Sequence, residues 1–194
     1  MRDLILASTS PWRRQMLESA GIRLRCESSG FDERSVVVPD AAEMALVLAR
    51  SKARSVAQRF PDAWVIGADQ VVTDGVSAWG KPSDPADHRR QLLSMRGKSH
   101  ELVTGFCVLG PDIDESGVER TRMFVRADVD EAEVDAYVAS GEGSGCAGGY
   151  AVEGRGVFLF ERIEGDWFNV IGLPLLQVMT VLRRHGWRAT PERG

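Results

Sequence analysis

Hydrophobic and polar positions follow one another along this chain in blocks that predict alternating strands and helices. The apolar run at residues 4–7 is typical of a short buried strand. Ser10 directly before Pro11 predicts a helix start, since serine caps a helix and proline suits its first position. Gly21 should end that helix. The N-terminus therefore predicts a strand, a hydroxyl-rich turn and a helix.

A second helix is predicted from a capping-box-like start at Asp40 and Glu43 to about Arg59. Its apolar stripe consists of Ala45, Ala49, Ala53, Val56 and Phe60. Lys52 lies beside this stripe, so its ammonium group is expected at the edge of a buried face. A lysine whose stem is buried and whose charge reaches water is the commoner arrangement at such a position.

Residues 63–73 predict a buried strand that carries Asp69 near its middle, followed by a turn at Asp74 and Gly75. Burying a carboxylate without a cation or strong donors costs several kcal/mol, about 3 or more. We therefore expect Asp69 to face a cleft or a metal ion and to have a functional role.

The rest of the chain continues the alternation of helices and strands. The pattern predicts a helix from Asp84 to Gly97, strands at 100–109 and 118–129, a helix from Asp130, a glycine-rich loop at 141–149, a strand at 157–161 and a closing helix from Leu173. The loop matches neither common phosphate-binding glycine motif, so alone it is weak evidence for a nucleotide site. Together the elements predict an α/β protein with a mixed sheet, in two lobes with a cleft between them.

Composition narrows the class of protein. The chain has 194 residues, 43% of them hydrophobic and 27% charged, which suits one sizeable core or two small lobes. The net charge of -4 argues against a protein that binds nucleic acid regardless of sequence, and no apolar run reaches the length of about 18 residues expected of a membrane span. Three scattered cysteines indicate neither a disulfide framework nor a zinc site, so we expect a cytoplasmic protein.

The candidate chemistry lies in two sets of side chains. Anion donors are Ser8, Ser10, Arg13, Lys52 and Lys81, and the carboxylates are Glu33 and Asp69. Hydroxyls and cations at a helix start suit a phosphate, although capped turns of this kind are also common in proteins that bind no anion. Carboxylates suit Mg²⁺ or Mn²⁺, and one of them could deprotonate an attacking water. The combination favours a polyphosphate substrate with a divalent cation.

The order of short motifs along the chain resembles that of the Maf-type nucleoside triphosphate pyrophosphatases. The matching segments are Ala-Ser8-Thr-Ser10-Pro-Trp-Arg13, Asp32-Glu33, Lys52-Ala53, Ile-Gly-Ala-Asp69-Gln70-Val-Val, Gly80-Lys81-Pro82, Gly97-Lys-Ser-His100-Glu-Leu-Val-Thr104-Gly105, Ala147-Gly-Gly-Tyr150 and Asn169-Val-Ile-Gly-Leu-Pro174. Each segment is unspecific, but their joint order is not. The resemblance implies one such domain over residues 1–194, with an elongated central sheet in a two-lobed fold.

The resemblance also implies hydrolysis of the bond between the α and β phosphates of a nucleotide, with a divalent metal. It makes Asp69 the proton acceptor, and Ser8, Arg13, Glu33, Lys52 and Lys81 further phosphate, metal or catalytic contacts. Glu33 and Asp69 are the expected metal ligands, and whether Asp69 is a base or primarily a metal ligand stays open. The expected partner is a small nucleotide, without stable nucleic acid or membrane; the oligomeric state stays open, a homodimer included.

Three residues bear on the base of the nucleotide. At three positions this chain has Trp12, Gln70 and Glu153, which resemble the residues of the family branch that cleaves 7-methyl-GTP. The dTTP/UTP branch has Arg, Thr and Gln at these positions. A methylated, cationic guanine can stack on an indole, and a carboxylate can accept its N–H groups. We therefore expect 7-methyl-GTP as substrate. The alternatives are a dTTP/UTP pyrophosphatase of the same family and a nucleotide-binding regulator of septum formation.

Overall fold

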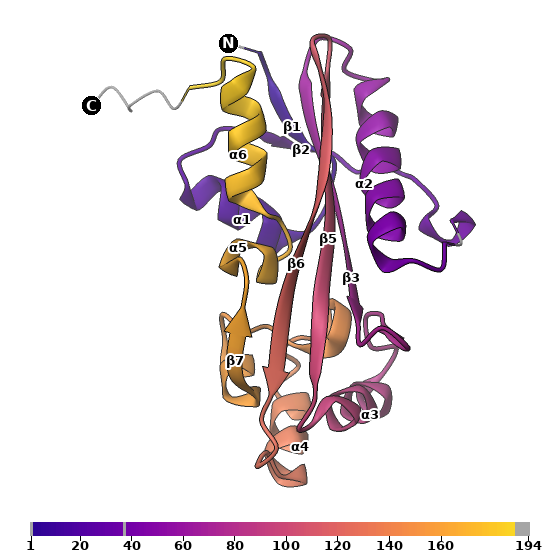
Figure 1. Cartoon of the computed structure of the whole chain (residues 1–194), viewed down its shortest axis with the longest axis vertical. Helices are drawn as coiled ribbons and strands as arrows, with labels where there is room; N and C mark the ends of the chain where they lie inside the picture. The colour runs from indigo at the N-terminus through magenta and orange to yellow at the C-terminus, as the bar shows by residue number, and fades with distance from the viewer. Residues whose placement is uncertain (1, 37, 189–194) are drawn as a thin grey trace. The chain divides into compact units, whose positions relative to one another are not determined.

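The structure is a computed structural model that describes residues 2–36 and 38–188, apart from the side chain of Arg34. Its strands are β1 (Leu4–Leu6), β2 (Arg25–Cys26), β3 (Trp64–Thr73), β4 (Ala78–Trp79), β5 (Ser99–Gly110), β6 (Ile113–Val125) and β7 (Phe160–Glu164). Its α-helices are α1 (Pro11–Ser19), α2 (Ala41–Ala57), α3 (Pro85–Met95), α4 (Glu131–Ala139), α5 (Trp167–Val170) and α6 (Leu175–Arg184) (Figure 1). Three short 3₁₀ helices lie at Glu33–Ser35, Ala147–Gly149 and Arg155–Leu159.

The strands form one mixed sheet. Within the described residues it has seven strands, in the order β2-β1-β3-β5-β6-β7, and β4 pairs with β3 beside this path. β1 runs parallel to both β2 and β3, with Leu4 opposite Trp64 and Leu6 opposite Ile66. The β3–β4 and β6–β7 pairs are antiparallel. The expected α/β fold with a mixed central sheet flanked by helices is therefore confirmed.

Contacts divide the chain into two compact units. Unit 1 consists of Met1–Asp69, Thr104–Val118 and Gly172–Gly194, and unit 2 of Gln70–Val103 and Glu119–Ile171. Three of the four boundaries fall inside β3, β5 and β6, so each of these strands contributes residues to both units, and the fourth lies between α5 and α6. Asp69 is the last residue of unit 1 on β3.

In unit 1, helix α2 packs directly against β3 and β5 because glycine stands at both contacts. A Cβ atom on Gly67 would lie 2.2 Å from the carbonyl oxygen of Ala49, and one on Gly105 would lie 2.4 Å from the carbonyl of Ala45. The small residues of the α2 stripe are buried as the sequence predicts, and the helix begins at the predicted cap, Asp40. This close approach brings the middle of α2 next to the middle of β3 (Figure 1).

Unit 2 has its own apolar core, to which α3, α4, β5, β6 and the chain after Gly149 contribute. The core includes Leu92, Met95, Leu102, Met123, Val134, Tyr137 and Tyr150. Asp84 caps α3, and Asp130 with Glu133 forms a complete capping box on α4, as their sequence predicts. Within the described residues, no helix is long and apolar enough to span a membrane.

Two predicted strand starts are wrong, and one helix was not predicted. β6 begins at Ile113 rather than 118, because the polar residues that resemble a turn belong to the strand and only two residues join it to β5. β7 begins at Phe160 rather than 157, since residues 155–159 form a 3₁₀ helix. The short helix α5 was not predicted.

Candidate functional site

The turn between β1 and α1 is organised by its own hydroxyl groups. Ser10 caps α1, and its Oγ accepts a hydrogen bond from the backbone N–H of Arg13 at 3.4 Å. Ser8 Oγ accepts from the backbone N–H of Ser10 at 3.1 Å. The two hydroxyls act here as acceptors, so each keeps its own O–H to donate to a ligand. The sequence-predicted cap is confirmed, although two of the backbone N–H groups expected to face an anion are already bonded.

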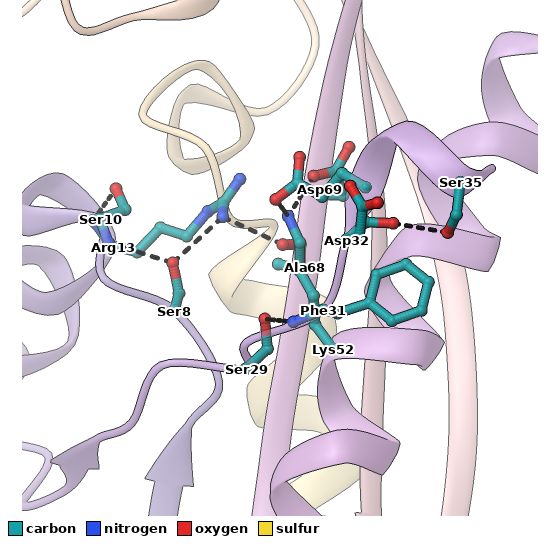
Figure 2. A network of polar contacts seen from close by, with 11 residues as sticks. Ser8, Ser10, Arg13, Ser29, Phe31, Asp32, Ser35, Lys52, Ala68 and Asp69 are labelled. Atoms are coloured by element: carbon teal, nitrogen blue, oxygen red, sulfur yellow. Dashed lines mark hydrogen bonds and ion pairs between the residues drawn. The ribbon is translucent and has the colours of Figure 1, made fainter.

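The Arg13 side chain is held in place by three acceptors of unit 1. Nε donates to the carbonyl oxygen of Gly172 at 2.7 Å. Nη1 donates to the carbonyl of Ala68 at 3.0 Å and to Ser8 Oγ at 3.4 Å (Figure 2). None of these bonds uses Nη2, which has no acceptor among the described residues. The guanidinium is thus fixed through Nε and Nη1 and keeps the N–H donors of Nη2, an arrangement that suits an anion.

Lys52 joins two carboxylates. Its Nζ lies 2.5 Å from Asp69 Oδ1 and 2.8 Å from Glu33 Oε1 (Figure 2 shows the contact with Asp69). Lys52 and Asp69 are only 7% and 8% exposed, whereas the Glu33 side chain is 54% exposed. Lys52 is therefore a buried ion-pair partner, and the interpretation of a lysine reaching water from a buried stem is wrong at this position.

The turn that carries Glu33 is tied to α2. Ser35 Oγ donates to the carbonyl oxygen of Asp32 at 2.6 Å, and the backbone N–H of Phe31 donates to Ser29 Oγ at 3.3 Å (Figure 2). Ser55, one turn beyond Lys52 on α2, donates to the carbonyl of Ser29. These bonds hold the turn against α2 and keep Glu33 beside the Lys52 ammonium.

Burial and charge act in opposite directions on Asp69 and Arg13. Burial raises the pKa of Asp69 above its usual 3.8, while Lys52 and Arg13 pull it back down and Glu33 raises it further. Burial also lowers the pKa of Arg13, and the charges of Asp69 and Glu33 oppose that effect. Asp69 is consequently a carboxylate whose proton affinity is increased while cations keep it ionisable, which is the usual requirement for a general base.

Two carboxylates of this site, Glu33 and Asp69, are candidate ligands for a divalent cation. No group of three or more His, Cys, Asp or Glu side chains in the described residues is arranged to hold a metal ion. Glu33 and Asp69 nevertheless flank one ammonium, and Mg²⁺ commonly binds through one or two carboxylates together with substrate phosphates and water. The two predicted ligands therefore fit a metal that arrives with a phosphorylated substrate.

The structure brings six sequence-predicted residues together in unit 1: Ser8, Ser10, Arg13, Glu33, Lys52 and Asp69. Trp12, on the first turn of α1, is half-buried. Gln70, Lys81 and Glu153 belong to unit 2. Gln70 Nε2 donates to the backbone carbonyl of Asn169 at 2.7 Å, so this side chain has a structural partner.

Lys81 and Glu153 are both exposed, and both act electrostatically on Cys146 in unit 2. The pKa of the Cys146 thiol is raised to about 11, mainly by burial and also by Glu153, while Lys81 acts to lower it. In the loop 141–149, Gly143 packs against its own chain: a Cβ on Gly143 would lie 2.4 Å from the carbonyl oxygen of Gly149. Gly143 therefore serves close backbone packing, whereas a Cβ on Gly141 would meet open space.

Sequence reasoning missed two residues that support this region of unit 2, Tyr137 and Glu142. The Tyr137 hydroxyl accepts from the backbone N–H of Ala151 at 3.0 Å, and Glu142 Oε1 accepts from that of Gly156 at 2.9 Å. The only signal in the sequence is a tyrosine and a glutamate near a glycine-rich segment, which does not reveal these contacts.

Known proteins resemble this chain over nearly its whole length. A family model described as Maf-like protein matches residues 3–185. A dTTP/UTP pyrophosphatase of Deinococcus radiodurans is 45% identical over 94% of this chain and 93% of its own length. Proteins with the same name from Geobacillus sp. (strain WCH70) and Pyrococcus furiosus are 38% and 36% identical, covering 96% and 94% of this chain and 100% and 95% of their own.

A solved structure supports the fold independently. A HAM1 protein from Coxiella burnetii superimposes with a TM-score of 0.51 at 13% identity, covering 95% of this chain and 100% of that one. The relatives' names do not support the expected 7-methyl-GTP branch, and they match its alternative instead. The extent of the family match and the identity to these relatives leave one conclusion: the chain belongs to the Maf-like protein family.

Proposed function

We propose that the protein is a nucleoside triphosphate pyrophosphatase that hydrolyses the bond between the α and β phosphates. The observation that carries this proposal is the buried Asp69 carboxylate, held 2.5 Å from the Lys52 ammonium beside the fixed guanidinium of Arg13. A buried acid among cations suits a reaction in which a water is deprotonated next to a polyanion. The names of the relatives agree with this chemistry.

The α1 turn would bind the phosphates. The hydroxyls of Ser8 and Ser10 and the Nη2 edge of Arg13 can each donate to a phosphate oxygen, and the positive end of α1 favours an anion at the same place. Lys52 would add a further positive charge, and Lys81 of unit 2 is proposed as another phosphate contact. These donors neutralise and orient the triphosphate.

Asp69 would take the proton of the attacking water. The water oxygen forms a bond to the α phosphorus, the bond from that phosphorus to the bridging oxygen breaks, and pyrophosphate leaves with the electron pair. Glu33 and Asp69 would hold a divalent cation such as Mg²⁺ or Mn²⁺, which supplies charge neutralisation at the phosphate oxygens. Lys52, bonded to both carboxylates, keeps them in position.

The first candidates for the base are thymine and uracil, because relatives with 36% to 45% identity are named dTTP/UTP pyrophosphatases. A second candidate, 7-methylguanine, is favoured by Trp12 and Glu153. The indole of Trp12 is half-buried, which leaves part of it accessible to stack on a cationic base, and Glu153 is exposed and can accept from guanine N–H groups.

The test is the release of pyrophosphate and nucleoside monophosphate from dTTP, UTP, CTP, GTP and 7-methyl-GTP, with Mg²⁺ or Mn²⁺. The proposal expects pyrophosphate as a product of at least one nucleotide, released about 10²–10⁴-fold more slowly with Asp69→Asn. Preference for dTTP or UTP supports the first candidate, and preference for 7-methyl-GTP the second. Release of single phosphates only would contradict cleavage between the α and β phosphates, and no turnover of any nucleotide would favour a nucleotide-binding regulator.

A paired substitution tests the base-contact argument. If Trp12 and Glu153 select 7-methylguanine, Trp12→Arg with Glu153→Gln should lower kcat/KM for 7-methyl-GTP at least about tenfold, or about 1.4 kcal/mol of transition-state binding. The ratio of kcat/KM between 7-methyl-GTP and dTTP is the readout, because a general loss of folding would lower both. An unchanged ratio removes the second candidate.

A further inference from the structure

A short turn in unit 2, residues 151–156, carries Glu153 and is fastened at both ends. At its start, the backbone N–H of Ala151 donates to the Tyr137 hydroxyl at 3.0 Å. At its end, the backbone N–H of Gly156 donates to Glu142 Oε1 at 2.9 Å. Across the turn, the N–H of Gly154 donates to the carbonyl oxygen of Ala151 at 3.2 Å. The base of the turn is therefore fixed while the Glu153 side chain is exposed.

The two fastening residues are linked to each other. The Glu142 carboxylate acts on the Tyr137 hydroxyl, whose pKa is raised mainly by burial and also by Glu142, and each of the two residues makes its own bond to the turn. Tyr137 is 5% exposed and belongs to the core of unit 2 on α4. The turn is thus attached at its start to a helix of the core by Tyr137, and at its end to the half-buried Glu142 carboxylate.

The glycines of the turn are required by this attachment. A Cβ on Gly154 would lie 2.7 and 2.8 Å from the two oxygens of Glu142, and one on Gly156 would lie 2.3 Å from the carbonyl of Ala151. Any side chain at 154 would therefore push the Glu142 carboxylate away. The missing side chain at 154 makes room for the carboxylate that fastens the turn.

We propose that Glu142, supported by Tyr137, is a positioning residue for nucleotide selection, holding the turn that presents Glu153 to the base. This inference rests on the proposed function with its second candidate base, 7-methylguanine, for which Glu153 is the proposed contact. Glu142 touches no reacting atom in this scheme and acts through Glu153. Loosening the turn would weaken binding of the base and reduce the discrimination between bases, whereas the groups around Asp69 would be unchanged.

The test compares Glu142→Ala and Gly154→Ala with the wild-type chain in steady-state hydrolysis of dTTP, UTP, GTP and 7-methyl-GTP. Both variants should raise KM for the preferred nucleotide about tenfold and change kcat less than about twofold. They should also narrow the spread of kcat/KM among the four bases. Gly154→Ala removes no charged group and displaces only the end of a flexible side chain, so it tests the attachment even where Glu142→Ala folds poorly.

Two controls separate positioning from general damage. Glu142→Gln keeps an oxygen that can accept from Gly156 and should restore KM, and Glu161→Ala removes an exposed glutamate of β7 and should have no effect. In a Glu153→Gln background, Glu142→Ala should cause no further change, because its effect passes through Glu153. Equal effects in both backgrounds, or an unchanged KM in both variants, would overturn the inference.

Failure of the proposed function gives a different result. If the wild-type chain releases no pyrophosphate, the proposed reaction is wrong, and the same variants are compared by their Kd for dTTP and 7-methyl-GTP. A loss of affinity in Glu142→Ala that depends on Glu153 still supports the positioning role. A Kd that is independent of Glu142 contradicts it.

Discussion

Replacing Lys52 by methionine should expose the cost of the buried Asp69 charge. Lys52 and Asp69 are 7% and 8% exposed, with the ammonium 2.5 Å from the carboxylate. Removing one member of such a pair leaves an uncompensated buried charge and costs about 3–5 kcal/mol. Methionine keeps most of the volume of the lysine stem, so the loss reports on charge rather than on a cavity. We expect a decrease in unfolding free energy near the lower end of this range at neutral pH, because Arg13 still faces Asp69.

The loss in Lys52→Met should depend on pH with a defined sign. Burial already raises the folded-state pKa of Asp69 above 3.8, and removing Lys52 raises it further because Lys52 is the largest factor lowering it. A carboxyl group with a raised folded-state pKa favours folding when protonated and loses that benefit as pH rises toward the folded-state pKa. The deficit relative to wild type should therefore be larger at about pH 8 than at about pH 5.

Chemical denaturation of both proteins at the two pH values measures this difference. Lys52→Met combined with Asp69→Asn is the matched control, since it removes both charges and should recover much of the lost stability and its pH dependence. A deficit of equal size at both pH values, or a double variant as unstable as the single one, would refute the reasoning.

Three further predictions test other parts of the structure. In the pH profile of kcat/KM, the acid limb should have its midpoint above 3.8, because burial raises the pKa of Asp69. Asp69→Asn should lower kcat by about 10²–10⁴-fold. An acid limb with its midpoint at or below 3.8 would contradict the assignment of Asp69 as base. Gly67→Ala should lower the unfolding free energy by about 1–3 kcal/mol and reduce turnover, because a Cβ 2.2 Å from the Ala49 carbonyl must push α2 and Lys52 away from β3. Calorimetry measures the loss of stability and steady-state kinetics the loss of turnover. An unchanged Tm would show that α2 moves freely. Burial lowers the pKa of His100 from 6.5 to about 4, so the unfolded state binds the proton more tightly, and about 3 kcal/mol of stability should be lost as pH falls through this interval. In denaturant titrations, His100→Phe should lack this acid-dependent loss of stability. The same acid dependence in wild type and His100→Phe would exclude His100 as the cause.

Local signals in the sequence predicted most helix starts correctly. Ser10, Asp40, Asp84 and Asp130 all cap the helices that follow them, because a cap depends on a side chain and on backbone N–H groups two or three residues away. The boundaries of β6 and β7 were missed, because strand ends depend on partners far away in the sequence. The polar residues near 113–117 are typical of a turn by composition but lie in a strand paired within the sheet.

The candidate site was predicted as a set of residue types, and its geometry was not. Asp69 stood out because a lone carboxylate in an apolar strand requires compensation. The sequence did not show that Lys52 compensates it, since this contact exists only where α2 lies on β3 at Gly67 and on β5 at Gly105. The substrate expectation rested on Trp12, Gln70 and Glu153, and the structure gives Gln70 a backbone partner on Asn169 that residue identity alone could not reveal.

The sequence by itself determined the α/β class, the helix caps, the hydroxyl-rich turn before α1 and the presence of a carboxylate that had to be paired, because these follow from neighbouring residues and from the cost of burying charge. Tertiary structure alone decided which cation pairs with Asp69, which acceptors fix Arg13 and how Glu142 fastens the turn of Glu153. The physical reason is distance along the chain. Lys52 and Asp69 are separated by 17 residues and Arg13 and Gly172 by 159, and packing of α2 at its glycine contacts sets the first of these contacts.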